Sequence, residues 1–162
     1  MRIFVTVGAQ MPFDRLIGAV DAWAEAHPGH SVEAQIGESA LLPAHLAWSR
    51  MLSPAELGRA LDGADVIVGH AGTGTIFAAL EREKPLLVMP RSAALGETRN
   101  DHQLATAARL GARLGVSVAW DEHELVARLA TLDRVLPSRA LAPEAGGALV
   151  GAIAAFIDGR LE

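Results

Sequence analysis

Apolar and polar residues follow two different rhythms along this chain, and the rhythm changes at short intervals. Short runs rich in β-branched residues, such as 3–7 and 66–68, are typical of strands that are covered on both faces. Other stretches carry apolar residues three or four positions apart, as at Leu16, Val20 and Trp23, which is typical of helices. Because the two patterns alternate, the sequence predicts an α/β fold with a mainly parallel sheet.

Capping and turn residues set the expected boundaries of these elements. Ser53 with Glu56 and Asp121 with Glu124 have the spacing of a capping box at a helix start, and Gly111 suits a helix end. The predicted strands span residues 3–7, 32–36, 46–50, 66–68, 85–89 and 116–119. The predicted helices span residues 13–26, 54–63, 73–83, 101–111, a stretch after 121, and 143–157.

Residues 65–80 are the most informative segment, because they predict a buried strand, a glycine-bearing turn and a helix in succession. Gly72 and Gly74 allow main-chain N–H groups to approach a ligand closely, and Thr73 or Thr75 is expected to cap the helix. A helix N-terminus offers free N–H groups and the positive end of the helix dipole. The segment therefore predicts an anion site at the carboxyl end of a parallel strand.

Two common nucleotide-binding fingerprints do not fit this turn. A dinucleotide site needs a small residue where Phe77 stands, and an acidic residue after the next strand, which instead ends at residues 89–91, Met-Pro-Arg. A P-loop needs Gly-Lys-Ser/Thr, and the chain has no such tripeptide. The predicted anion site therefore belongs to another kind of nucleotide binder.

Composition narrows the function further. With 162 residues, of which 51% are hydrophobic and 20% charged, the chain is expected to form a single domain over residues 1–162. The net charge of −5 disfavours nucleic-acid binding, and the lack of cysteine excludes thiolate chemistry and disulfides. No acidic metal-binding cluster, signal peptide or apolar span is evident, so we expect a cytoplasmic protein without a cofactor or metal.

Several ordered motifs carry a family resemblance. Residues 70–75 (His-Ala-Gly-Thr-Gly-Thr), 84–90 (Lys-Pro-Leu-Leu-Val-Met-Pro) and 100–103 (Asn-Asp-His-Gln) resemble the C-terminal, donor-binding domain of family 28 glycosyltransferases. Residues 5–14 and 90–103 resemble its stand-alone subunits: the PssE-type exopolysaccharide glycosyltransferase subunit and the catalytic subunit of the bipartite dolichol-pathway UDP-GlcNAc transferase. The likeness covers most of the chain.

This resemblance implies a Rossmann-like, three-layer fold equivalent to the donor-binding half of a GT-B enzyme. Such proteins transfer a sugar from a UDP-sugar (here UDP-GlcA, UDP-GlcNAc or a UDP-hexose) to a lipid-linked acceptor, with inversion and without a metal. The missing half would be a membrane-anchored partner subunit that carries the acceptor site and holds this chain at the inner face of the membrane. Met11 and Phe13 belong either to a partner surface or to the core.

Other readings stay open at this point. The chain could be a self-sufficient domain, a homo-oligomer, or a UDP-sugar-binding or scaffolding subunit without catalysis of its own. An unrelated α/β nucleotide-binding enzyme is a further alternative.

The resemblance also assigns roles around the diphosphate. His70 would donate to a phosphate oxygen, while Gly8 and Gln10 would approach from the facing side. Asp14 is the candidate general base, unless the partner chain supplies it, and its other expected role is to favour the dipole of the first helix. The residues expected to cradle the diphosphate are Gly72, Thr73, Gly74 and Thr75.

A second group is expected to face the sugar. Its members are the polar residues after the fifth strand: Arg91, Glu97, Arg99, Asn100, Asp101 and Gln103. Gln103 and Asp101 are the best candidates for hydroxyl contacts, while Asn100 and Asp101 can also cap the next helix. If the sugar is a uronic acid, Arg91 or Arg99 is expected to pair with its carboxylate.

One position departs from the family pattern. The family usually has a Glu in the helix after the glycine turn, where it holds the ribose hydroxyls, and here Ala78 stands in its place. Glu81 lies three residues further on, almost a full turn away. Ribose recognition is therefore expected to be looser, or to come from other residues.

Overall fold

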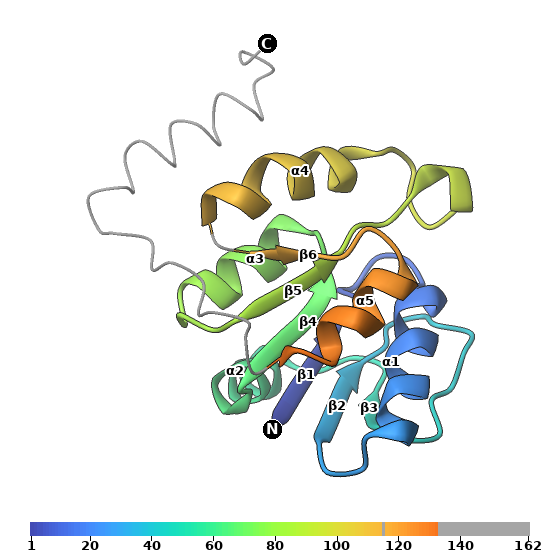
Figure 1. Cartoon of the computed structure of the whole chain (residues 1–162), viewed down its shortest axis with the longest axis vertical. Helices are drawn as coiled ribbons and strands as arrows, with labels where there is room; N and C mark the ends of the chain where they lie inside the picture. The colour runs from blue at the N-terminus through green and yellow to red at the C-terminus, as the bar shows by residue number, and fades with distance from the viewer. Residues whose placement is uncertain (115, 133–162) are drawn as a thin grey trace.

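The computed structural model describes residues 1–114 and 116–132, and within them a six-stranded sheet forms the centre of the molecule (Figure 1). The strand order is β3-β2-β1-β4-β5-β6, and every neighbouring pair is parallel. The strands are β1 (Arg2–Thr6), β2 (Ser31–Gln35), β3 (Ala47–Ser49), β4 (Val66–His70), β5 (Leu86–Met89) and β6 (Ser117–Val118).

Helices cover both faces of this sheet (Figure 1). They are α1 (Asp14–Ala26), α2 (Pro54–Gly63), α3 (Thr73–Leu80), α4 (His102–Leu114) and α5 (Glu122–Leu129), with a short 3₁₀ helix η1 (Ala93–Leu95). On one face, Val5 and Val68 pack with apolar side chains of α1 and α5. On the other, Phe4 and Ile67 pack with α2, α3 and α4. The predicted three-layer, Rossmann-like architecture is confirmed.

Alternation along each central strand produces these two cores. Successive side chains of a strand point to opposite faces, so Val5 and Phe4 enter different cores although they are adjacent. Each fully buried side chain of this size contributes about 1.5–3 kcal/mol relative to an exposed one. Phe13, whose place the sequence left open, is fully buried in the α1–α5 core.

Several helix boundaries differ from the prediction. Gly72, rather than a threonine, is the N-cap of α3, and no side chain caps this helix. The helix ends at Leu80 instead of Glu83, and Glu83 itself takes a left-handed conformation with φ 51°. Helix α4 continues past Gly111 to Leu114. The capping box at Ser53 is confirmed, and the predicted helix 143–157 lies outside the described residues.

The strand order creates a switch point between β1 and β4. From β1 the chain builds outward through β2 and β3, whereas β5 and β6 extend the sheet beyond β4 on the other side. Ligands of such sheets bind at the carboxyl ends of the strands that flank the switch point. Here those ends lead into residues 8–12, which we call the first loop, and into the glycine turn, residues 71–75. In the part of the chain that the structure describes, no helix combines the length and apolar character needed to cross a membrane.

Candidate active site

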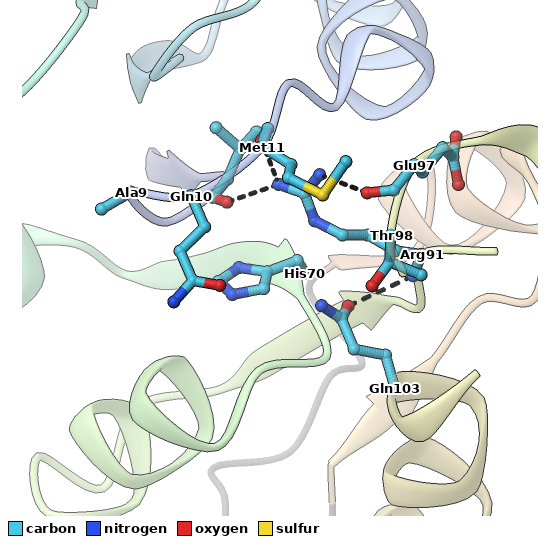
Figure 2. A pocket seen from close by; sticks show the side chains of 9 residues that line it. Ala9, Gln10, Met11, His70, Arg91, Glu97, Thr98 and Gln103 are labelled. Atoms are coloured by element: carbon cyan, nitrogen blue, oxygen red, sulfur yellow. Dashed lines mark hydrogen bonds between the residues drawn. The ribbon is translucent and has the colours of Figure 1, made fainter. Parts of the chain in front are cut away.

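A small cavity of about 80 Å³ opens at the carboxyl ends of β1, β4 and β5 (Figure 2). Pockets that enclose a small-molecule ligand usually hold about 300–1,000 Å³. The cavity is therefore too small to enclose a nucleotide sugar by itself. Its lining residues are Val7, Ala9, Gln10, Met11, His70, Arg91, Glu97, Thr98 and Gln103.

Five predicted site residues line this cavity, and four of its lining residues were not predicted. The predicted ones are Gln10, His70, Arg91, Glu97 and Gln103. The others are Val7, Ala9, Met11 and Thr98. They carry no polar pattern that marks them in the sequence, and they enter the site because they stand beside marked residues on the same loops.

His70, the last residue of β4, lies with its ring between two glycines. A Cβ added to Gly8 would come within 2.8 Å of the ring, and one added to Gly72 within 2.3 Å. The hydroxyl of Thr75 lies 3.4 Å from Nδ1. Withdrawal from water and, second, the charge of Arg91 lower the pKa of His70 to about 4, against the opposing effect of a hydrogen bond to the Thr6 backbone. His70 is therefore neutral at pH 7 and serves as a hydrogen-bonding group.

The glycine turn leaves backbone donors free at the start of α3. The first bond of the helix runs from the N–H of Ile76 to the carbonyl of Gly72, at 3.1 Å. The N–H groups of Thr73, Gly74 and Thr75 thus have no partner within the helix. A Cβ added to Gly74 would meet nothing within 4 Å, so the turn faces open space there. This arrangement suits an anion.

The first loop faces the turn, but Gly8 does not offer its N–H to the cavity. That N–H donates to the hydroxyl of Thr6 at 3.1 Å, and the Gly8 carbonyl accepts from Nε2 of Gln35 at 3.2 Å. Gly8 has φ 73°, which favours glycine, and its lack of a side chain makes room for His70. Ala9 and Gln10 line the cavity in its place.

Arg91 lines the cavity, but the terminal N–H groups of its guanidinium donate to backbone carbonyls (Figure 2). Nη1 donates to the carbonyls of Pro12 at 2.5 Å and Glu97 at 3.1 Å. Nη2 donates to those of Val7 at 2.8 Å and Met11 at 2.6 Å. Four bonds use all four terminal hydrogens of a guanidinium. The expected pairing of Arg91 with a sugar carboxylate therefore does not fit this geometry.

Glu97 is held in an ion-pair network that sequence reasoning missed. Nε of Arg15 donates to its Oε1 at 2.7 Å, and Nη2 to its Oε2 at 2.9 Å. Nη1 of Arg15 also reaches Glu122 at 3.0 Å, so one guanidinium joins α1, the loop after η1 and α5. The bonds to Glu97, and then to Glu122, raise the pKa of Arg15 against the opposing effect of burial. No spacing in the sequence links these three positions.

The polar residues around the start of α4 divide between the cavity and the loop structure. The N–H of Arg91 donates to Oε1 of Gln103 at 3.2 Å, which leaves the Gln103 amide N–H groups for a ligand. Asp101 accepts from the N–H of Ala93 at 2.9 Å, and Asn100 accepts from that of His102 at 3.2 Å. Both are exposed, as is Arg99, and none of the three lines the cavity.

Asp14 stands in the first turn of α1, away from the cavity. Its Oδ1 accepts hydrogen bonds from the Ser39 hydroxyl and from the N–H of Ala40. It is not among the lining residues. Of its two expected roles, the structure favours the one at the helix N-terminus, where an acid is favourable to the dipole.

The helix face that would carry the family's ribose-binding Glu is partly exposed here. Ala78 offers no polar side chain, and its carbonyl accepts from Arg82 at 3.0 Å. Glu81 lies past the end of α3 with 67% of its side chain exposed, and its carboxylate is 3.8 Å from the guanidinium of Arg82.

Among residues 1–114 and 116–132, no group of three His, Asp or Glu side chains could hold a metal ion.

A family model matches most of the chain and shows to which family it belongs. Residues 2–145 match the model of the glycosyltransferase family 28 C-terminal domain. The chain belongs to this family. No curated protein matches it in sequence.

Solved structures share the fold. ALG13 is similar with a TM-score of 0.60 and 21% identity over 85% of this chain and 88% of that one. MurG from Acinetobacter baumannii has a TM-score of 0.59 at 19% identity, over 82% of this chain and 42% of its own. The calicheamicin glycosyltransferase CalG4 has a TM-score of 0.59 at 18% identity, over 82% and 34%. The chain thus spans about a third of CalG4 but most of ALG13.

Proposed function

We propose that this chain is the donor-binding half of a glycosyltransferase that takes its sugar from a UDP-sugar. The observation that carries the proposal is the pairing of two backbone elements at the switch point. The unpartnered N–H groups of α3 lie on one side of His70, and the first loop lies on the other. Membership of the family 28 C-terminal domain supports a nucleotide sugar as the anion.

In the proposed reaction, an acceptor hydroxyl oxygen bonds to the anomeric carbon from the face opposite the diphosphate. The bond from that carbon to the diphosphate oxygen breaks, and its electron pair leaves with UDP, so the configuration inverts. Donors that are already in place stabilise the growing charge, and the loss of one such donor typically costs roughly 3 kcal/mol. We propose the N–H groups of Thr73, Gly74 and Thr75 and the neutral His70 as these donors.

The hydroxyl proton needs a base, and the acceptor needs a second surface. Asp14 is directed toward Ser39 and Ala40, which favours a base supplied by another chain. The small cavity supports a site that is completed by a second surface, because it does not enclose the donor by itself. We therefore propose that a membrane-anchored partner subunit completes the site and brings a lipid-linked acceptor. The Gln103 amide is then the proposed contact for a donor hydroxyl.

Thermal shift with uridine nucleotides tests donor binding. UDP and UDP-sugars (UDP-GlcNAc, UDP-GlcA and UDP-glucose) at millimolar concentration should raise the melting temperature, whereas ADP and NAD should not. His70→Ala should reduce the shift. If no uridine nucleotide stabilises the protein, the donor assignment is wrong.

A transfer assay separates catalysis from binding alone. This chain is co-expressed with a candidate membrane subunit, and transfer from each UDP-sugar to a lipid acceptor is followed. Turnover that falls in His70→Ala supports catalysis by this site. Donor binding without turnover with any partner supports the alternative, a UDP-sugar-binding or scaffolding subunit.

A further inference from the structure

Arg91 ties both ends of the first loop to one buried point. Its guanidinium holds the Val7 carbonyl, just before the loop, and the Met11 and Pro12 carbonyls at its end. Gln35 holds the Gly8 carbonyl from another side. In a trans peptide the N–H points away from the C=O. Anchoring the Val7 and Gly8 carbonyls therefore also fixes the direction of the Gly8 and Ala9 N–H groups. The Met11 carbonyl precedes Pro12, which has no N–H, so its bond to Arg91 fixes the path of the chain at the end of the loop.

The anchor itself has little freedom. Arg91 is only 3% exposed, and its guanidinium carbon lies 4.7 Å from the ring centroid of the buried Phe13. Its fourth terminal bond reaches the Glu97 carbonyl, and Arg15 in turn fixes the Glu97 side chain. The two loops that face each other across the cavity thus meet at one guanidinium (Figure 2).

The charge of Arg91 is not cancelled by a direct partner. Its four acceptors are neutral carbonyl oxygens, and arginine stays protonated in proteins. A lysine could keep the charge, but a compact ammonium cannot span four carbonyls that surround a planar fork. This difference allows geometry and charge to be separated by experiment.

We propose that Arg91 is a positioning residue, which sets the affinity for the donor by fixing the first loop and does not touch the donor. The proposal rests on the function proposed above. Between the tied ends, Ala9, Gln10 and Met11 line the cavity, so the course of this lining segment depends on the two ends that Arg91 holds. In the sequence Arg91 has the character of a ligand-binding cation. In the structure it holds the backbone of the first loop instead.

Two variants and one control test this role, with UDP as the probe. Arg91→Lys keeps the charge, Arg91→Met removes it, and Arg59→Gln removes a charge from an exposed position on α2. Calorimetry on fully folded protein should show UDP affinity lowered at least about tenfold in both Arg91 variants, because small misplacements of binding groups are costly. Arg59→Gln should bind UDP as the wild type does.

Amide hydrogen exchange supplies a second measurement that needs no ligand. In Arg91→Lys the amides of residues 8–11 should exchange faster, while those of α1 stay unchanged. If Arg91→Met does not fold, Arg91→Lys decides.

The outcomes separate this proposal from the proposed function. Wild-type affinity and unchanged exchange in Arg91→Lys would overturn it. So would affinity that is lost in Arg91→Met but kept in Arg91→Lys, because charge alone would then suffice. If the wild type does not bind UDP, the proposed function fails and exchange in the first loop alone decides the role of Arg91.

Discussion

The Nε2 atom of His70 would lie only 2.3 Å from a Cβ on Gly72. Yet Gly72 has φ −84° and ψ 141°, a conformation that any residue adopts. The ring of His70, and not the backbone, therefore requires glycine at this position. Together with Gly8 on the other side of the ring, Gly72 makes His70 the spacer between the two elements proposed to hold the diphosphate.

Gly72→Ala should consequently destabilise the protein by about 1–3 kcal/mol, the usual cost of overpacking a filled site. Urea denaturation measures the change. In a His70→Ala background the same substitution should cost much less, because the clashing ring is gone. Equal costs in both backgrounds would show that the ring does not set the requirement.

The low pKa of His70 predicts a specific dependence of stability on pH. Unfolded histidine has a pKa of about 6.5, whereas folded His70 has one of about 4. Between these values the unfolded chain binds a proton that the folded chain does not, so stability is complete above pH 6.5 and falls as the pH drops. From pH 7.5 to 5.0 the loss from this residue should be about 2 kcal/mol.

Comparison with His70→Asn isolates this loss. The pKa of His30 is also lowered, mainly by burial, but its contribution is common to both proteins. Urea denaturation at the two pH values should therefore show a smaller decrease for His70→Asn. Parallel pH profiles of the two proteins would contradict the neutral state of His70.

Gly74 allows the anion site to be tested without disturbing the fold. Because a Cβ there meets nothing within 4 Å, Gly74→Ala should fold well and gain up to about 1 kcal/mol of helix propensity. Gly74→Asp places a negative charge beside the free N–H groups, so it should abolish UDP binding while the protein stays folded. Calorimetry with UDP measures the binding. Undiminished affinity in Gly74→Asp would place the diphosphate elsewhere.

The local parts of this site were predictable from the sequence, whereas its long-range contacts were not. The strand, turn and helix around His70 follow from β-branched runs and glycines within a short window. The role of Arg91 depends on carbonyls of a loop some eighty positions earlier, which the fold alone brings near. Composition shows a charge in a loop and predicts contact with solvent or ligand. It does not show that Arg91 is buried.

The Arg15 network offers a last prediction, because its two carboxylates differ in burial. The side chain of Glu97 is 11% exposed and accepts two bonds from Arg15, whereas that of Glu122 is 45% exposed and accepts one. Neutralising Glu97 leaves the largely buried Arg15 with only the exposed Glu122 as its ionic partner, while an exposed pair contributes little. Glu97→Gln should therefore lower the free energy of unfolding by about 2–4 kcal/mol, and Glu122→Gln by less than about 1 kcal/mol, as measured by urea denaturation.

The same two variants also test the link to the site. Because Glu97 also accepts from the N–H of Ser92, its loss should loosen the cavity wall and weaken UDP binding, which Glu122→Gln should leave intact. Equal effects of the two substitutions would mean that the network stabilises α5 and does not hold the site.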